Sequence, residues 1–191
     1  MTARSAPCSA PPPRSRRRAR RALAAVSAGG LAALAWASFV SPLPRLTYNP
    51  SDSVAVGWYR IDPHTRGRDA PHVGSLVLVP LPGNAAALAA RRGYLPRGVP
   101  LLKPVAAIAP QRVCVLDGSV RIGGVPVATV LHADGRGRPL RAWAVCRRLR
   151  PSELFLLGTT NPASFDSRYF GPVKASAVLG IAHPVWLETR R

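Results

Sequence analysis

The sequence predicts a mainly β protein, with one compact antiparallel-β domain at residues 42–188 and an N-terminal transmembrane helix at residues 22–40. Three observations indicate this arrangement. Short apolar segments alternate with Gly- and Pro-containing turns through most of the chain, as is typical of antiparallel sheets. The chain has no internal repeat and no βαβ alternation, which argues against a parallel sheet. One uncharged stretch near the N-terminus is long enough to cross a membrane as a helix.

The first element is a basic tail at residues 1–21, which contains several arginines and no acidic residue. It accounts for much of the formal net charge of +19, and the remaining arginines are scattered through turns. The chain has no basic stripe interleaved with aromatic residues. We therefore expect no specific nucleic-acid binding and favour affinity for an anionic membrane surface.

The uncharged segment at residues 22–40 follows this tail and would form a helix about 28 Å long at ~1.5 Å per residue. A cluster of arginines before such a helix predicts a cytoplasmic N-terminus and an exported C-terminal domain. A cleaved signal peptide is the alternative, because Leu23 to Ala35 suits its apolar region and Ala35-Trp36-Ala37 has the small-x-small form of a cleavage site. In both cases the chain leaves the cytoplasm from about Ser41 onward.

The exported part begins with an extended segment at residues 49–63 and a short β run between Gly74 and Pro80. Residues 84–93 form a predicted helix, with Asn84 as its N-cap and Gly93 at its end.

A β meander follows, with strands expected near residues 101–108, 112–116, 119–122 and 125–130. Asp117-Gly118 and Gly123-Gly124 are expected to be two-residue hairpin turns. Residues 132–143 read as a polar surface loop, and further strands are expected in residues 153–158 and 176–188.

Two cysteines, Cys114 and Cys146, lie in the exported part, where the environment is oxidising. A disulfide between them would stabilise the domain by about 3 to 4 kcal/mol in the chain-entropy model. The alternative is two separate buried thiols. Because the chain has no CxxC motif and only four dispersed histidines, we expect no metal site, and no sequence feature indicates a cofactor.

Lys103 lies in the segment PLLKPVAAIA, which is strongly apolar. A buried ammonium group either finds an anion or loses its proton, and a neutral lysine can act as a general base. The alternative is a lysine at a strand edge whose amine reaches water.

A serine nucleophile with a lysine base needs an exposed serine, a neutral lysine and groups that orient the amine. Ser51 and Ser53 lie in a polar turn after the uncharged segment. Asp166 and Arg168 are two residues apart in the segment SFDSRYFGPV, so on a strand they would point to the same side and could pair.

Taken in order, the uncharged segment, the serine turn, LLKPVAA and SFDSRYFGPV resemble the S26 signal peptidases, and among them the TraF-type conjugative transfer peptidases. The resemblance covers about Asn49 to Trp186. It implies a signal-peptidase-like β domain. Pro104, where these families usually have Arg, is a departure from the pattern.

The resemblance also implies a role for each polar residue. Ser53 matches the nucleophile and Lys103 the general base, while Ser51 matches the residue whose hydroxyl joins the Ser53 N–H in the oxyanion hole. Ser164 matches the serine that hydrogen-bonds the lysine amine. The Asp166–Arg168 pair matches the ion pair that holds the wall of the site.

The implied function is that of a serine endopeptidase in the bacterial inner membrane, anchored by one N-terminal helix, with its catalytic domain in the periplasm. Its partners would be exported precursor polypeptides, which carry a signal peptide or are conjugative pilins. The acceptor would be water or, in pilin cyclisation, the amino terminus of the substrate. The alternative is a catalytically silent, anchored β domain that binds an exported partner. Two departures from the family pattern permit it: Pro104, and Ser53-Val54-Ala55-Val56-Gly57 where these families often have Ser-x-Pro-x-Gly.

Overall fold

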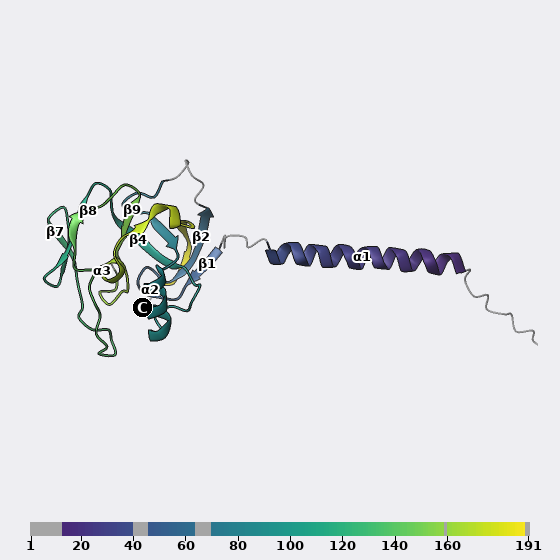
Figure 1. Cartoon of the computed structure of the whole chain (residues 1–191), viewed down its shortest axis with the longest axis horizontal. Helices are drawn as coiled ribbons and strands as arrows, with labels where there is room; N and C mark the ends of the chain where they lie inside the picture. The colour runs from purple at the N-terminus through teal and green to yellow at the C-terminus, as the bar shows by residue number, and fades with distance from the viewer. Residues whose placement is uncertain (1–12, 40–45, 64–69, 159, 190–191) are drawn as a thin grey trace, which may run out of the picture. The chain divides into compact units, whose positions relative to one another are not determined.

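The structure is a computed structural model that describes residues 13–39, 46–63, 70–158 and 160–189. Its contacts divide the chain into two compact units, Met1–Pro42 and Leu43–Arg191. The described part of the first unit is a single helix, α1 (Pro13–Phe39), and the second unit contains all of the strands (Figure 1).

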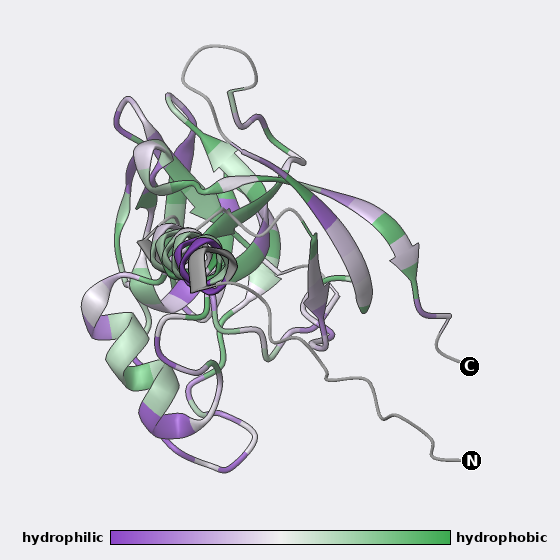
Figure 2. Cartoon of the chain, turned by 90° about the vertical axis from the view of Figure 1, so that its right-hand side faces the viewer, coloured by the Kyte–Doolittle hydropathy of each residue, from purple (hydrophilic) through white to green (hydrophobic). Residues whose placement is uncertain are grey.

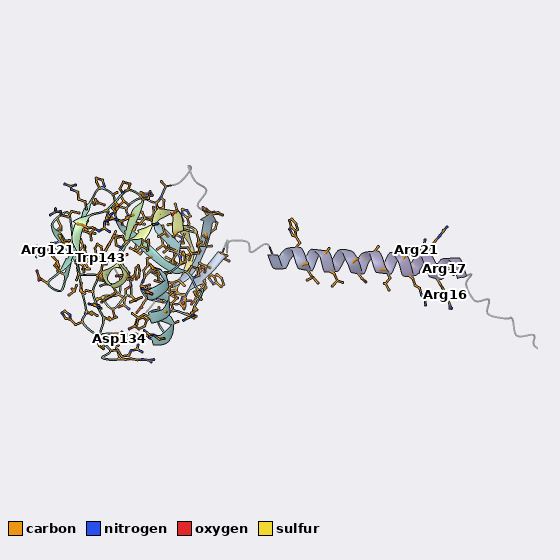
Figure 3. All side chains as sticks on the ribbon, viewed as in Figure 1. Arg16, Arg17, Arg21, Arg121, Asp134 and Trp143 are labelled. Atoms are coloured by element: carbon orange, nitrogen blue, oxygen red, sulfur yellow. A yellow bond between two sulfur atoms is a disulfide. The ribbon has the colours of Figure 1, made fainter. Side chains whose placement is uncertain are left out.

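Helix α1 includes nearly all of the segment for which a transmembrane helix was predicted. Arg16, Arg17 and Arg21 lie toward its N-terminal end (Figure 3). Among the described residues, no helix is both long enough and apolar enough to cross a membrane, so the predicted transmembrane helix is not found. The arginines in the first third of α1 are strongly hydrophilic, and they lower the mean hydropathy of the helix. Residues 1–12 of the predicted tail and residue 40 lie outside the described residues.

The described strands form two antiparallel sheets, so the predicted mainly β fold is confirmed. The larger sheet contains, in spatial order, β1 (Leu46–Asn49), β2 (Gly57–Pro63), β11 (Gly180–Leu187), β3 (Leu76–Val79), β4 (Leu101–Ile108), β9 (Glu153–Leu156) and β10 (Val173–Lys174). The smaller sheet contains β7 (Val125–Thr129), β6 (Ser119–Ile122), β5 (Arg112–Leu116) and β8 (Cys146–Arg148).

Strands β5, β6 and β7 of the smaller sheet follow the predicted meander, whereas its first predicted strand, residues 101–108, is β4 of the larger sheet. Asp117 and Gly118 have φ values of 50° and 69°, and Gly123 and Gly124 have values of 61° and 90°. Positive φ at both central residues is typical of the type I′ turn, whose twist matches that of the flanking strands. Within this sheet Cys114 and Cys146 lie directly opposite each other on β5 and β8, and they form a disulfide.

Helix α2 (Gly83–Arg92) begins one residue earlier than predicted. Pro82, not Asn84, is the N-cap, and no side chain caps the helix, so the prediction for Asn84 is wrong. The φ of Pro82, −55°, already suits a helix start, and Asn84 therefore lies within the first turn. At the other end Gly93 adopts the left-handed conformation with a φ of 72°, which confirms the predicted stop.

Two short helical segments lie near the C-terminus, α3 (Ser167–Phe170) and the 3-10 turn η1 (Ala175–Ala177). The turn η1 occupies the start of the strand predicted for residues 176–188, so β11 begins only at Gly180.

The core lies along the strands, which are mostly hydrophobic in the interior of the domain (Figure 2). One buried cluster joins the two sheets, because it contains Ala107 of β4, Val113 of β5, Val120 of β6 and Phe155 of β9. Strands β4 and β9 also contribute Val105, Leu154 and Leu156 to a second buried cluster, so both strands belong to two clusters. Any polar side chain that β4 directs inward is held rigidly and away from water.

Candidate active site

The turn between β1 and β2 is built around Asn49, the last residue of β1. Its amide group donates hydrogen bonds to the carbonyl oxygens of Ser51, Val54 and Ala55, at 2.7, 3.3 and 3.1 Å. Its Oδ1 accepts from the Ser51 N–H at 3.2 Å. Asn49 was not among the predicted site residues, although an Asn before Pro and Ser is a recognised turn signal. Asn49 holds the whole serine turn in one conformation.

The two serine hydroxyls of this turn form a short hydrogen-bonded chain. The Ser51 hydroxyl donates to Asn49 Oδ1 at 2.8 Å, and the oxygens of Ser51 and Ser53 are 3.0 Å apart. A hydroxyl has one proton, and that of Ser51 is already used on Asn49, so Ser53 donates to Ser51. Ser53 is 8% exposed. Its hydroxyl is therefore oriented rather than free to rotate.

Lys103 is the third residue of β4 and is 2% exposed, so the alternative of a lysine that reaches water at a strand edge is wrong. Its amine donates to the Ser164 hydroxyl at 2.5 Å. Burial lowers the pKa of Lys103 to about 8, and Arg168 acts in the same direction while Asp166 opposes it. With a pKa of about 8, roughly a tenth of this amine is neutral at pH 7, far more than for a lysine with the ordinary value of 10.5.

Asp166 and Arg168 form an ion pair that is almost completely buried. Two hydrogen bonds of 2.8 Å join the guanidinium to the carboxylate, one from Nε and one from Nη2. The carboxylate also accepts from the backbone N–H of Gly158 at 2.8 Å. Because the buried carboxylate is paired with Arg168 and hydrogen-bonded to Gly158, we interpret the pair as structural: it holds these segments together.

The remaining donors of Arg168 bind backbone carbonyls. Nη1 donates to Thr129 and Pro162, each at 2.9 Å, and Nη2 donates to Ser164 at 3.1 Å. One guanidinium therefore links the end of β7 to the loop that carries Ser164. This contact positions the Ser164 hydroxyl against Lys103.

Gly158 lies where the serine turn and the Ser164 loop meet. A Cβ atom on Gly158 would be 2.5 Å from Ser164 Oγ and 3.3 Å from the carbonyl oxygen of Ser53. The first distance is too short for a Cβ contact and the second is tight, so a side chain at this position would displace the Ser164 hydroxyl.

We expect Gly158→Ala to lower the rate of any reaction that uses Lys103 by about a hundred-fold, because small misplacements of positioning groups have effects of that size. The variant should also lose about 1–3 kcal/mol of folding free energy through overpacking. Turnover and urea unfolding would be compared with Gly83→Ala, since Gly83 has open space around it. Wild-type turnover by Gly158→Ala would contradict the proposed crowding.

The serine turn, Lys103 and the Ser164 loop line one cleft of about 530 Å³. Within the described part of the chain Ser53 and Lys103 share this cleft, but no hydrogen bond joins the hydroxyl to the amine. The walls are mainly apolar and include Leu95, Val99, Leu101, Leu140 and Phe165. A second hollow of about 100 Å³ also contains Ser51 and Ser53.

No group of three or more His, Cys, Asp or Glu side chains suited to a metal ion is found among the described residues. The polar side chains that line the cleft include the hydroxyls of Ser51, Ser53 and Ser164, the Lys103 amine and the carboxylates of Asp52 and Asp134.

Comparison with known proteins agrees with this picture. A family model described as signal peptidase, peptidase S26, matches residues 18–187. The conjugal transfer protein TraF of Agrobacterium tumefaciens (strain 15955) is 38% identical over 151 residues, which cover 74% of this chain and 81% of that protein. A probable conjugal transfer protein TraF of Sinorhizobium fredii is 40% identical over 122 residues, 59% of this chain and 63% of the relative, so this match spans less than two thirds of that protein.

Among solved structures, a signal peptidase I from Enterococcus faecalis V583 aligns with 59% of this chain and 97% of its own. The TM-score of this alignment is 0.36 and the sequence identity is 21%.

Proposed function

Because the chain belongs to the S26 signal peptidase family, we propose that it is a serine endopeptidase that uses Ser53 as nucleophile and Lys103 as general base. The observation that carries this proposal is a buried lysine amine in the same cleft as an oriented serine. Burial lowers the pKa of this amine, on Lys103, to about 8. A lysine with such a pKa can accept a proton near neutral pH. The Ser164 hydroxyl holds the amine in place.

The proposed reaction begins when Ser53 Oγ attacks the carbonyl carbon of the scissile peptide bond and its proton passes to Lys103 Nζ. The carbonyl oxygen becomes an oxyanion, which the Ser53 N–H and the Ser51 hydroxyl would stabilise. The Ser51 hydroxyl donates to Asn49 in the free protein, so it must turn toward the oxyanion. Collapse of the intermediate breaks the C–N bond, and the leaving amine takes the proton from Lys103. An acyl-enzyme remains on Ser53.

Release of the acyl group requires a second nucleophile, either water or the amino terminus of the same substrate. Water gives a shortened precursor, whereas the amine gives a cyclic product. The names of the relatives, conjugal transfer proteins, support an exported precursor of a conjugation apparatus such as a pilin as the substrate.

We also propose that the domain works on the exported side of a bacterial inner membrane, in the periplasm. The disulfide between Cys114 and Cys146 supports this, since disulfides persist in oxidising compartments. The arginines at the N-terminal end of α1 are consistent with a cytoplasmic N-terminus.

The pH dependence of precursor cleavage tests the proposed base. Only the neutral amine can accept a proton, and the pKa of Lys103 is lowered to about 8. We therefore expect kcat/KM to rise about ten-fold per pH unit below that value and to level off above it. Single-turnover assays from pH 6 to pH 10 against pilin and signal-peptide substrates would measure this. A flat profile would contradict a lysine base, and no turnover by folded protein would favour the silent binding domain.

A further inference from the structure

A second cluster of charged residues, outside the proposed catalytic groups, surrounds Asp134 in the loop at residues 132–143. The Asp134 carboxylate accepts hydrogen bonds from the Tyr94 hydroxyl, from Arg138 Nε at 2.7 Å, and from the N–H groups of Arg136 and Arg138 at 2.9 and 3.0 Å. Arg92 Nη1 is 3.7 Å away. Only 8% of the Asp134 side chain is exposed. This carboxylate has no remaining capacity for a new cation.

The same cluster ties the loop to the end of α2. Arg92 donates to the carbonyl oxygen of Pro139 at 2.9 Å, and Arg138 donates to the carbonyl oxygen of Arg92 at 3.2 Å. Asp134 lies in this loop at the lower edge of the domain in Figure 3. The loop was predicted to be a polar surface loop. The contacts make it a fixed part of the domain, which we call the latched loop.

Tyr94 is the residue through which the latched loop reaches the cleft. Its hydroxyl is held by Asp134, its ring packs against Phe165 with centroids 5.3 Å apart, and the Arg138 guanidinium lies 5.5 Å from its ring centroid. Tyr94 and Asp134 line the same cleft as Ser53. The tyrosine ring is therefore a rigid surface inside the proposed substrate site.

The charges near this surface favour one kind of side chain. Asp52 and Asp134 line the cleft, but Asp52 Oδ1 accepts from Asn161 at 2.8 Å and Asp134 is surrounded by arginine donors. A lysine or arginine of the substrate would lose its water beside the ring, where the Asp134 carboxylate is already paired with Arg138 and the Arg138 guanidinium lies over the ring. An apolar side chain would bury its surface against the ring.

We propose that Tyr94, held by Asp134, is a specificity-determining residue that selects apolar over basic side chains in the polypeptide that enters the cleft. The inference rests on the proposed function, because it takes the substrate to be a polypeptide bound beside Ser53. It adds to that function a chemical preference and the residue that sets it.

Peptide binding to the full-length Ser53→Ala protein would test this inference without turnover. The probes are two fluorescein-labelled decapeptides, mostly alanine, that differ at one central position, Leu or Lys. We expect the Leu peptide to bind about ten-fold more tightly, as burial of one large apolar side chain predicts. In the Ser53→Ala background, Tyr94→Ala should reduce the ratio of the two dissociation constants to within about two-fold.

Two further substitutions distinguish the contribution of the Tyr94 ring from that of its hydrogen bond to Asp134. Tyr94→Phe keeps the ring and should keep most of the ratio, whereas Asp134→Ala releases the ring and should reduce it. Asp62→Asn is the matched control, because Asp62 forms an exposed ion pair with Arg60 and does not line the cleft. It should leave the ratio unchanged.

The results also separate this inference from the proposed function. A Leu preference that depends on Tyr94, in a protein whose wild type cleaves nothing, would support the inference and reject the peptidase. Equal binding of the two peptides to the Ser53→Ala protein with Tyr94 and Asp134 intact would overturn the inference, as would no binding at all. A ratio that survives Tyr94→Ala in a folded protein, judged by thermal unfolding, would overturn it as well.

Discussion

Ser53→Ala and Lys103→Met are each expected to reduce precursor cleavage at least about a thousand-fold, since members of a catalytic unit fail together when one is removed. Ser53→Ala removes the attacking oxygen. Lys103→Met keeps the length and apolar stem of the side chain but removes the base. Lys174→Met is the control for loss of a lysine, because Lys174 is exposed. Cleavage by either site variant at a rate near that of wild type would refute the Ser–Lys mechanism.

The loss of activity in Lys103→Met should not be caused by unfolding. The lowered pKa of Lys103, about 8 in place of 10.5, means that its charged form is disfavoured in the folded protein. The difference corresponds to about 3 kcal/mol at ~1.36 kcal/mol per pH unit. The wild type bears this cost fully below pH 8, and it disappears as the pH rises toward 10.5.

Methionine carries no such cost, although it leaves the Ser164 hydroxyl without its present donor. We therefore expect Lys103→Met to be at least as stable as the wild type at pH 7, with any advantage smaller at pH 10. Urea unfolding at the two pH values measures this. A strongly destabilised variant at pH 7 would show that the amine contributes more to the fold than its burial indicates.

The elements that the sequence predicted well are those that depend on local chemistry. The hairpin turns at Asp117-Gly118 and Gly123-Gly124 require residues that tolerate positive φ, so their positions set the strands on either side. Gly93 ends α2 for the same reason. The apolar residues around Lys103 left open whether its amine is buried or reaches water, and its exposure of 2% selects the buried alternative.

Other features depend on contacts between distant parts of the chain. Strand β11 lies between β2 and β3 although it is the last strand in the sequence, and no local pattern predicts that order. The bond between Tyr94 and Asp134 joins residues 40 positions apart. The segment at residues 132–143 is rich in Gly and Arg, and nothing in this pattern predicts that the Asp134 side chain is buried.

The serine turn is an intermediate case. Ser51 and Ser53 could be chosen as candidates because the lysine and the Asp166–Arg168 segment suggested a serine partner. Asn49 could not be ranked above other turn-forming residues, because its role depends on the three carbonyl groups that it binds. Polar residues that organise a site through the backbone are therefore the ones that sequence reasoning overlooks.

Asp166→Ala is expected to cost about 3–5 kcal/mol of folding free energy, the usual effect of breaking a buried ion pair by removing one partner. Arg168 would remain buried without its carboxylate, and the Gly158 N–H would lose its acceptor. Asp62→Ala provides the comparison, because it breaks the exposed Arg60–Asp62 pair and should cost less than about 1 kcal/mol. Urea unfolding would measure both, and similar costs for the two variants would contradict a bracing role for Asp166.

Asp166→Asn separates the structural role of the carboxylate from its effect on the base. The amide can still accept a hydrogen bond from Gly158 or Arg168, but it has no charge. Because the Asp166 carboxylate raises the pKa of Lys103 against the larger effect of burial, its removal should lower that pKa further. The pH at which cleavage reaches its plateau should then move to the acid side in those molecules that remain folded. If Asp166 acted only by stabilising the fold, Asp166→Asn would reduce the rate without changing the pH at which cleavage reaches its plateau. A shift of this pH to the acid side would show that the charge of Asp166 acts on the Lys103 amine.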